Sequence, residues 1–477
     1  MSAVKKAGAA KTAPKNRKTE ISPSRKAAFQ ILLAVERGQS HSDDLLRGHA
    51  VNVLPAADRN LATALVLGVL RWQTFLDQRI RPLLKRPGGK LDPEVLIALR
   101  LGVFQLRFLD RIPAHAAIDE SVELTKKAGH RFAAGMVNAV LRSSARSTTA
   151  RGSAVHTGPL DESGDGSAAL QAHPAWLVER WTAAYGEDAM QAICRHGQSQ
   201  PRLAVRLESS AVQDELSKAG VELALAEFLA TVRIVVSGDV TATAAFREGR
   251  VRVQDEGSQL IGELAACTDL VQGQENIFDA CAAPGGKTLI LAERNPHARI
   301  VACESSQRRL AELRKRLAAY GDRVECRLAD AAGIEEDAAF DLALVDVPCS
   351  GTGTLGRNPE IRHRLKLEDL PRLADCQRGI LRAALRAVRP GGRVVYATCS
   401  LEPEENEQVV AAALAENASV RQISLAPAIE ALRENGILRA DGEERLRRCL
   451  TPDGALRLLP GALPTDGFFV ALIERTA

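Results

Sequence analysis

The chain has 477 residues, more than one hydrophobic core usually serves, which predicts two or three domains. Apolar residues make up 45% and charged residues 26%, and no uncharged apolar run approaches the ~18 residues that a membrane span needs. The chain starts without an apolar signal-peptide core and its nine cysteines are scattered, so we expect a cytoplasmic protein without a membrane partner.

The positive charge is concentrated at the start of the chain. Residues 1–26 carry a local charge of +7 within a total of +4, which leaves −3 for the rest. We expect residues 1–24 to form a disordered basic tail, and such a tail can add unspecific affinity for nucleic acid.

The front of the chain shows helical periodicity from Ser24, continuing at Leu61–Phe75, Pro93–Leu109, Ala116–Ala128 and Phe132–Leu141. The apolar spacing and short connections predict an all-helical bundle over residues 25–145. The stretches IPAHAAIDESVELTKKAG and FAAGMVNAVLR resemble the RNA-binding domain of the antitermination factor NusB. The resemblance implies that this bundle binds RNA.

A region of mixed character follows the bundle. Residues 146–172 are rich in Gly, Ser, Thr and Ala without apolar periodicity, so we expect a flexible linker. Residues 173–250 combine a helix around Trp176–Ala184 with the strand-like stretches PRLAVRL and ATVRIVV. They predict a small α+β subdomain, which we expect to take part in RNA binding.

From residue 251 to residue 477, short apolar strands alternate with amphipathic helices. The strand-like stretches are NIFDAC, RIVACE, RVECRLAD, FDLALVDV and GRVVYATCS. This alternation predicts a Rossmann-like α/β domain, with a parallel sheet covered by helices on both faces and a ligand site at the carboxyl ends of the strands.

A glycine-rich loop and three acids fall at these strand ends. The loop DACAAPGGKT follows the first strand, but it lacks both the Walker spacing and the G-x-G-x-x-G fingerprint. Glu304, Asp330 and Asp346 end the next three strands, although each alone could simply cap a helix. Carboxylates would repel a polyphosphate but suit ribose hydroxyls and a cationic group. Together these features predict S-adenosylmethionine as the cofactor.

Two cysteines follow two of these strands: Cys349 in DVPCSGTG and Cys399 in ATCS. Amine methyltransferases typically carry an Asn/Asp-Pro-Pro-aromatic turn where this chain has DVPC. Carbon 5 of cytosine is a poor nucleophile until a thiolate adds to carbon 6. One thiol can attack while a second group assists release, and a nearby acid can hold N3 as charge develops there. The two thiols therefore predict methylation of cytosine at carbon 5.

The motifs DACAAPGGKT, DVPCSGTG, ATCS and PEEN (Pro403–Asn406) resemble those of the RNA cytosine-5 methyltransferases, and with the NusB-like front the resemblance spans residues 25–477. In that family the Thr-Cys thiol is the nucleophile, which implies Cys399, and the Pro-Cys thiol, Cys349, assists product release. The resemblance also implies that Asp346 and Lys287 act beside the target base. The implied cofactor contacts are Cys281, Ala282, Ala283, Pro284, Gly285, Gly286, Lys287, Glu304, Asp330 and Asp346.

Two assignments have an alternative. In DNA cytosine-5 methyltransferases the Pro-Cys thiol attacks instead, so the roles of Cys349 and Cys399 rest on the resemblance. Arg309, five residues after Glu304, is a candidate contact of the cofactor or of RNA, although a solvated helix face explains it about as well.

The other cysteines have simpler explanations. Cys281, Cys303 and Cys326 lie in strand-like runs, where a free cysteine is usually a small core residue. The pair Cys194 and His196 has no partner at zinc-ligand spacing, so no metal is predicted.

The glycine-rich loop, the acidic strand ends and the two thiols predict an S-adenosylmethionine-dependent enzyme that methylates carbon 5 of a cytidine through a covalent adduct between cysteine and carbon 6, and the resemblance implies 16S ribosomal RNA as the substrate. The expected partner is that RNA, free or in an early assembly state, and the expected form is a monomer. A transfer RNA cytosine-5 methyltransferase is one alternative. A non-catalytic antitermination or assembly factor is another, although intact Cys349, Cys399 and Asp346 argue against it.

Overall fold

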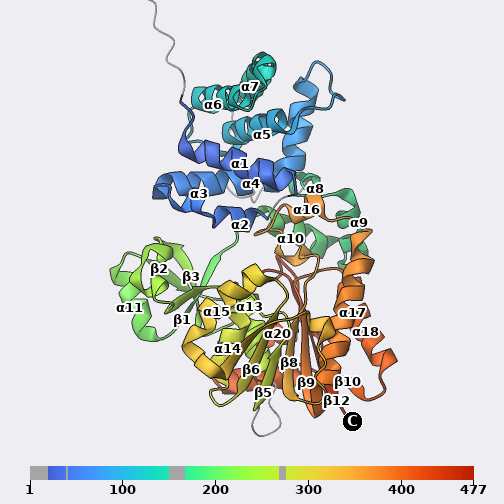
Figure 1. The fold of residues 1–477 in the computed structure, drawn as a ribbon. Helices are drawn as coiled ribbons and strands as arrows, with labels where there is room; N and C mark the ends of the chain where they lie inside the picture. Colours follow the sequence, from blue (N-terminus) through green and yellow to red (C-terminus); the bar gives the residue numbers. More distant parts are fainter. Residues whose placement is uncertain (1–19, 39–40, 150–166, 268–274, 477) are drawn as a thin grey trace, which may run out of the picture. The chain divides into compact units, whose positions relative to one another are not determined.

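The computed structural model describes residues 20–38, 41–149, 167–267 and 275–476, which fall into two compact units that divide after residue 158. The first unit consists of helices, and the second is built around strands (Figure 1). The expected basic tail lies outside the described residues up to residue 19, and the expected linker lies outside them over residues 150–166. None of the helices in the described ranges has the length and hydropathy needed to cross a membrane.

The first unit is the expected all-helical bundle. Its helices are α1 (Pro23–Glu36), α2 (Ser42–Leu46), α3 (His49–Asn52), α4 (Ala56–Ile80), α5 (Pro93–Phe108), α6 (Ala114–Lys127) and α7 (Ala134–Thr149). The helix expected to start at Leu61 begins earlier, directly after Pro55, because a proline is well placed just ahead of a first helical turn. Pro93 occupies the first turn of α5, as predicted.

Two glycines set the closest helix crossings in this bundle. A Cβ atom on Gly68 of α4 would lie 2.0 Å from the ring of Phe104 on α5. A Cβ atom on Gly102 of α5 would lie 2.6 Å from Leu141 on α7. Since real side chains do not approach this closely, a larger residue at either position would force the helices apart.

The second unit begins with three helices and a small antiparallel sheet. The helices are α8 (Ser167–Gln171), α9 (Ala175–Tyr185) and α10 (Glu187–Gln198), and they pack on Leu355 and Leu401 from later in the chain. The sheet has the order β2-β3-β1-β4, with β1 (Leu203–Leu207), α11 (Ser210–Lys218), β2 (Glu222–Leu225), β3 (Val232–Ser237), α12 (Ala244–Arg247) and β4 (Val251–Val253). Because β4 pairs with β1, this sheet extends past the boundary expected at residue 250.

A larger sheet forms the centre of the second unit, in the order β10-β12-β9-β8-β5-β6-β7, with β11 paired to β12. Its strands are β5 (Asn276–Asp279), β6 (Arg299–Glu304), β7 (Val324–Leu328), β8 (Phe340–Asp346), β9 (Val388–Thr398), β10 (Val420–Ile423), β11 (Leu456–Leu458) and β12 (Phe468–Arg475). The predicted parallel arrangement is confirmed from β9 to β7.

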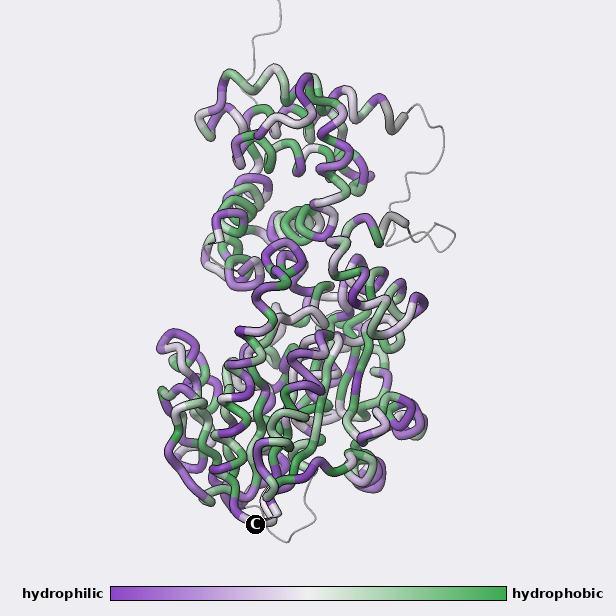
Figure 2. Tube along the Cα trace, turned by 90° about the vertical axis from the view of Figure 1, so that its right-hand side faces the viewer, coloured by the Kyte–Doolittle hydropathy of each residue, from purple (hydrophilic) through white to green (hydrophobic). Residues whose placement is uncertain are grey.

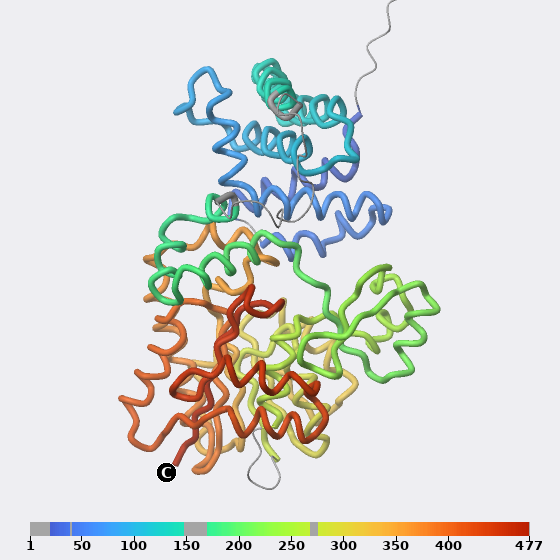
Figure 3. The backbone as a smooth tube through the Cα atoms, turned by 180° about the vertical axis from the view of Figure 1, so that it is seen from behind, coloured from blue at the N-terminus to red at the C-terminus, as the bar shows by residue number. Residues whose placement is uncertain are grey.

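The C-terminal strand departs from the prediction of a parallel sheet. β12 runs antiparallel between β9 and β10, so the sheet is mixed. Figure 3 shows this last segment, in red, returning beside the orange strand β9. The antiparallel return brings the residues just before β12 to the same sheet edge as the ends of β8 and β9.

Helices cover both faces of the large sheet, as predicted. One face packs against α13 (Glu256–Ala266), α14 (Gly286–Arg294), α15 (Gln307–Leu317) and α19 (Ala426–Glu434), and the other against α17 (Asp369–Ala387) and α18 (Glu407–Glu416). The strands alternate accordingly, since Leu342 and Leu344 point to the first core and Ala343 and Val345 to the second. In Figure 2 the helices alternate between hydrophobic and hydrophilic residues, as helices with one buried face do.

A buried ion pair links the small sheet to the helices that cover the large sheet. Arg206 on β1 donates to Glu263 on α13 at 2.7 Å and contacts Glu293 at 3.2 Å. The Glu263 side chain is fully buried and also accepts a hydrogen bond from Arg294 at 2.7 Å. The carboxylate therefore depends on two cations to offset the loss of its hydration.

We predict that Arg206→Ala lowers the free energy of unfolding of the second unit by about 3 kcal/mol, because one of the two cations beside buried Glu263 is lost. Arg202→Ala is the matched control, since its 2.8 Å pair with Glu227 is exposed and should contribute less than about 1 kcal/mol. Urea unfolding followed by circular dichroism measures both. Equal losses in the two variants would contradict the prediction.

Candidate active site

The loop between β5 and α14 approaches its neighbours too closely for side chains at its two glycines. Gly285 has a φ of +97°, and a Cβ atom there would lie 2.8 Å from Leu313. A Cβ atom on Gly286 would lie 2.9 Å from the amide group of Gln254. The glycines thus let the loop fit between α15 and the residues that follow β4.

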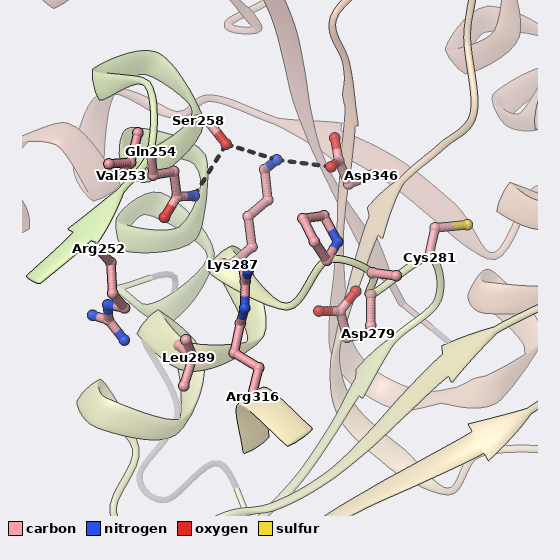
Figure 4. A pocket seen from close by; sticks show the side chains of 14 residues that line it. Arg252, Val253, Gln254, Ser258, Asp279, Cys281, Lys287, Leu289, Arg316 and Asp346 are labelled. Atoms are coloured by element: carbon pink, nitrogen blue, oxygen red, sulfur yellow. Dashed lines mark hydrogen bonds and ion pairs between the residues drawn. The ribbon is translucent and has the colours of Figure 1, made fainter. Parts of the chain in front are cut away.

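A cavity opens beside this loop (Figure 4). It brings together several of the predicted residues with others that the sequence did not indicate. Its lining consists of Arg252, Val253, Gln254, Ser258, Asp279, Cys281, Ala282, Ala283, Pro284, Gly286, Lys287, Leu289, Arg316 and Asp346. Of the predicted site residues, Gly285, Glu304, Arg309, Asp330, Cys349 and Cys399 are not part of this lining.

Most of the unpredicted lining comes from the end of the small sheet and from α13, and the rest is Asp279, Leu289 and Arg316 from β5, α14 and α15. Gln254 and Ser258 flank the cavity opposite Lys287, and Gln254 donates to the Ser258 hydroxyl at 3.1 Å (Figure 4). The feature of the sequence that could have indicated these residues is the polar run QDEGSQ, which separates the apolar segments that end at Val253 and begin at Leu260.

Lys287 lies at the centre of this arrangement. Its ammonium group contacts the Asp346 carboxylate at 2.7 Å and the Ser258 hydroxyl at 3.1 Å (Figure 4). Burial by itself would lower the pKa of Lys287, but the charge and hydrogen bond of Asp346, together with nearby Cys399, raise it above its ordinary value. The site therefore holds a positively charged lysine beside the end of β8.

Asp279, at the end of β5, is a second acid beside Asp346. Its buried carboxyl group accepts a hydrogen bond from the Thr288 hydroxyl at 2.7 Å. Burial raises its pKa to about 7, and the charge of Asp346 adds to that rise.

Glu304 is a buried acid that the fold connects to the glycine loop. It ends β6, accepts a hydrogen bond from the Ser306 amide at 2.8 Å and pairs with Arg309 at 3.3 Å. Arg309 also donates to the carbonyl oxygen of Ala283 at 2.6 Å. It therefore bridges Glu304 and the loop, so it is more than a solvated residue on a helix face.

Asp330, the third predicted acid, has a structural role in the described fold. Asp330 caps a short 3-10 turn by accepting a hydrogen bond from the Ala332 amide at 3.1 Å.

The three cysteines expected in the core differ in their placement. Cys303 is fully buried in β6, as predicted, whereas Cys326 in β7 is only partly buried. The placement of Cys281 in a strand is wrong: β5 ends at Asp279, because the chain turns there into the glycine loop, and Cys281 lines the cavity.

The two predicted catalytic thiols lie side by side. Cys349 Sγ and Cys399 Sγ are 3.3 Å apart, and both side chains are partly buried. Cys349 follows β8 and Cys399 follows β9, and these strands pair in parallel with Asp346 opposite Ala397. Equal register at the carboxyl ends therefore brings the two cysteines together.

A glycine allows the two cysteine loops to meet. The Gly353 amide donates to the Cys399 carbonyl oxygen at 2.9 Å. A Cβ atom on Gly353 would lie 2.8 Å from that oxygen and 2.4 Å from the carbonyl oxygen of Gly467. A side chain at this position in DVPCSGTG would push the loop away from Cys399.

The PEEN segment and α9 support the Cys399 loop from the other side. Thr398 donates to the Asn406 side chain at 2.5 Å, and Asn406 in turn donates to the Ser400 carbonyl oxygen at 2.9 Å. From α9, Trp181 donates to the buried Glu402 carboxylate at 3.0 Å, and Arg180 pairs with it at 2.9 Å. The loop after the second thiol is thus held on both sides.

Three family descriptions match successive parts of the chain: the NusB family over residues 22–146, the RsmF/B-like ferredoxin-like domain over residues 173–240, and 16S rRNA methyltransferase RsmB/F over residues 268–474. The probable ribosomal RNA small subunit methyltransferase B of Bacillus subtilis strain 168 is 32% identical, over 94% of this chain and 98% of the relative. The chain belongs to the ribosomal RNA small subunit methyltransferase B family. The predicted membership of an RNA methyltransferase family with a NusB-like front is thereby confirmed.

Other comparisons agree with membership of this methyltransferase family. The ribosomal RNA small subunit methyltransferase B of Pseudomonas putida is 32% identical, over 95% of this chain and 98% of the relative. The crystal structure of PH0851 is similar with a TM-score of 0.74 and 25% identity, over 96% of this chain and 100% of that chain.

We predict that Asp279, whose pKa burial raises, lowers the stability of this methyltransferase as the pH rises from 5 to 8, whereas His173 and His196, whose pKa values burial lowers, act in the opposite direction. The raised pKa means that the folded protein keeps a proton that the unfolded chain has already lost, so folding is favoured at the lower pH. Over this range Asp279 should account for about 2 to 3 kcal/mol.

Asp279→Asn tests this, because it removes the titrating group and keeps an oxygen for the Thr288 hydroxyl. In urea unfolding, the free energy of unfolding at pH 8 minus that at pH 5 should be about 2 to 3 kcal/mol more positive in the variant than in the unsubstituted protein. Asp466, whose pKa burial also raises to about 7, contributes equally to both proteins. An identical pH dependence in the two proteins would refute the assignment.

Proposed function

We propose that the protein is an S-adenosylmethionine-dependent methyltransferase that methylates carbon 5 of a cytidine in 16S ribosomal RNA. The observation that carries this proposal is the pair of thiols, 3.3 Å apart, at the ends of β8 and β9. Methylation of an exocyclic amine needs no thiol, whereas carbon 5 becomes nucleophilic only after a thiolate adds to carbon 6. The names of the relatives support methyl transfer to small-subunit ribosomal RNA.

The donor set fits S-adenosylmethionine. Acids at three successive strand ends, Glu304, Asp330 and Asp346, suit a cationic ligand with ribose hydroxyls, and the tight glycine loop leaves its backbone open to close approach. We assign Glu304 to the ribose hydroxyls and the loop Cys281–Lys287 to the remaining contacts, with Asp330 and Asp346 completing the set. When bound, S-adenosylmethionine supplies an electrophilic methyl group on a sulfonium.

In this proposal Cys399 attacks and the Lys287–Asp346 pair stabilises the resulting charge. The Cys399 thiolate forms a bond to carbon 6, and the electron pair of the C5–C6 double bond shifts toward N3. The ammonium protons of Lys287, held by Asp346 at 2.7 Å, can stabilise negative charge at N3. Carbon 5 is then an enamine carbon that can accept the methyl group.

Cys349 then completes the reaction by moving protons. Its thiol gives a proton to the departing Cys399 sulfur as the bond to carbon 6 breaks, and its own sulfur takes the proton lost from carbon 5. The C5–C6 double bond re-forms, both sulfurs are left as thiols, and one proton passes to solvent before the next turnover. The 3.3 Å separation of the two sulfurs supports direct transfer between them.

We predict that Cys399→Ala abolishes methylation, whereas Cys349→Ala accumulates an enzyme–RNA adduct, because attack proceeds and release fails. Denaturing gels of each variant, incubated with unmethylated 16S RNA and S-adenosylmethionine, measure the adduct, and transfer of a labelled methyl group measures turnover. An adduct that persists in Cys399→Ala and is absent from Cys349→Ala would reverse the two roles.

The substrate itself is tested by bisulfite sequencing of RNA from cells that lack the protein. We predict that one protected cytosine in 16S ribosomal RNA loses its protection, because carbon-5 methylation is what resists deamination. Loss of a transfer RNA signal would indicate a transfer RNA enzyme with the same chemistry. No loss in either RNA would favour a non-catalytic RNA-binding factor. The monomeric form, the assembly state of the RNA and the domain boundaries stay predictions.

A further inference from the structure

Glu405, in the PEEN motif, joins the two loops that carry the thiols. Its Oε1 atom accepts hydrogen bonds from the amide of Ser350, directly after Cys349, at 2.8 Å, and from Gln377 at 2.8 Å. Its Oε2 atom accepts from the hydroxyl of Ser400, directly after Cys399, at 2.5 Å. The side chain is fully buried, so one carboxylate fixes the spacing of both cysteine loops.

The charges around the two thiols differ. All three donors to the Glu405 carboxylate are neutral, so its charge faces Cys349 without a cation among them. On the side of Cys399, the ammonium group of Lys287 is close enough that the charge of Cys399 is among the causes that raise the pKa of Lys287. An electrostatic gradient therefore runs across the 3.3 Å between the sulfurs.

Other titratable groups packed around Glu405 do not cancel its charge. The Tyr396 hydroxyl donates to the backbone carbonyl of Glu405 at 2.6 Å, and burial raises its pKa well above the ordinary value, so it stays neutral. Glu402 is itself an acid, and its partner Arg180 is engaged with Glu402 and Glu404. The surroundings of Cys349 therefore carry a net negative charge.

We propose that Glu405 is a positioning residue that holds the two thiols in register and whose buried negative charge keeps Cys349 protonated, so that Cys399 is the sulfur that ionises. The proposal rests on the proposed function, because it assigns the two roles from the charges in this chain. The pKa of the Cys349 thiol is raised well above its ordinary value by the hydrogen bond with Cys399, by burial, and by the charges of Cys399 and Glu405.

The consequence for the reaction is a single shared proton. When the pair loses one proton, the remaining proton stays on Cys349 and the electron pair is left on Cys399, which can then attack carbon 6. After methylation the same proton moves to the departing Cys399 sulfur, and Cys349 receives the proton from carbon 5. Without the charge of Glu405, Cys349 and Cys399 would share the proton more equally. A fraction of the enzyme would then carry the thiolate on Cys349.

The test measures the ionisation of Cys349 directly, without RNA or cofactor. Cys399→Ala removes the neighbouring sulfur, and the rate of iodoacetamide alkylation of Cys349, followed by peptide mass spectrometry against pH, gives the midpoint of its ionisation. We expect a midpoint above 9. Adding Glu405→Gln should lower it by about one pH unit, because the carboxylamide keeps an acceptor oxygen but loses the charge.

Two matched variants separate charge from packing. Glu404→Gln removes a neighbouring charge that pairs with Arg180 and should leave the midpoint near that of the Cys399→Ala parent. Glu405→Asp keeps the charge on a side chain that is shorter by one methylene group. It should preserve most of the raised Cys349 midpoint. In the enzyme that retains both cysteines, it should slow adduct release. Thermal unfolding shows which variants are folded.

Several outcomes would overturn the proposal. An unchanged Cys349 ionisation midpoint in a folded Glu405→Gln variant would refute the electrostatic role. If no Glu405 variant folds, a midpoint at or below 9 in the Cys399→Ala parent would refute it. Cytosine-5 chemistry is judged separately by the adduct gels. An adduct in Cys349→Ala with no effect of Glu405 on the titration would leave the proposed function intact and refute this inference alone.

Discussion

The parallel pairing of β8 with β9 is the constraint on which the rest of the site depends. Asp346 ends one strand opposite Ala397 in the other, so the residues that follow, Cys349 and Cys399, leave the sheet at the same edge. The two thiols are fifty positions apart in the chain, and the register of this strand pair brings them to the same end of the sheet, where they lie 3.3 Å apart. A slip of one residue would turn Asp346 to the opposite face of the sheet and remove it from Lys287.

Around that edge the fold concentrates polar groups that are individually costly to bury. Three arrangements lower the cost of burying these groups. Lys287 and Asp346 form an ion pair, burial favours the neutral form of Asp279, and neutral donors give hydrogen bonds to Glu405. Of these groups, the Lys287 ammonium group holds its proton beside Asp346, and burial favours the protonated carboxyl group at Asp279. The proposed reaction, which moves protons on and off sulfur and carbon, would benefit from groups whose ionisation is set by their surroundings instead of by water.

The sequence predicted the parts of this site that are local in the chain. These parts are short motifs at the ends of apolar strands: the glycine loop, the acids at the strand ends and the two cysteines. Because the strands are parallel, the motifs are expected to meet at one end of the sheet. The sequence did not predict Gln254 and Ser258, or the antiparallel strand β12, because their positions depend on pairing between distant segments. Arg206 is similar: nothing near it in the chain indicates that its partner is Glu263.

These distant segments also explain why the cysteine loops are stable in one position. Arg357, just beyond the Cys349 loop, pairs with Asp466 at 2.6 Å and with Asp255 at 2.8 Å. Asp255 caps α13, the helix that carries Ser258, and Asp466 precedes β12.

One guanidinium group thus links the Cys349 loop, the Lys287 side of the cavity and the C-terminal strand. Gly467, next to Asp466, donates its amide to the Gly353 carbonyl at 2.8 Å, so the C-terminal segment also closes on the Cys399 side. The mixed sheet is therefore more than a variation on the parallel arrangement. Its antiparallel last strand delivers the segment that holds both thiol loops against the helix bearing Ser258, and a purely parallel sheet would leave these loops without that support.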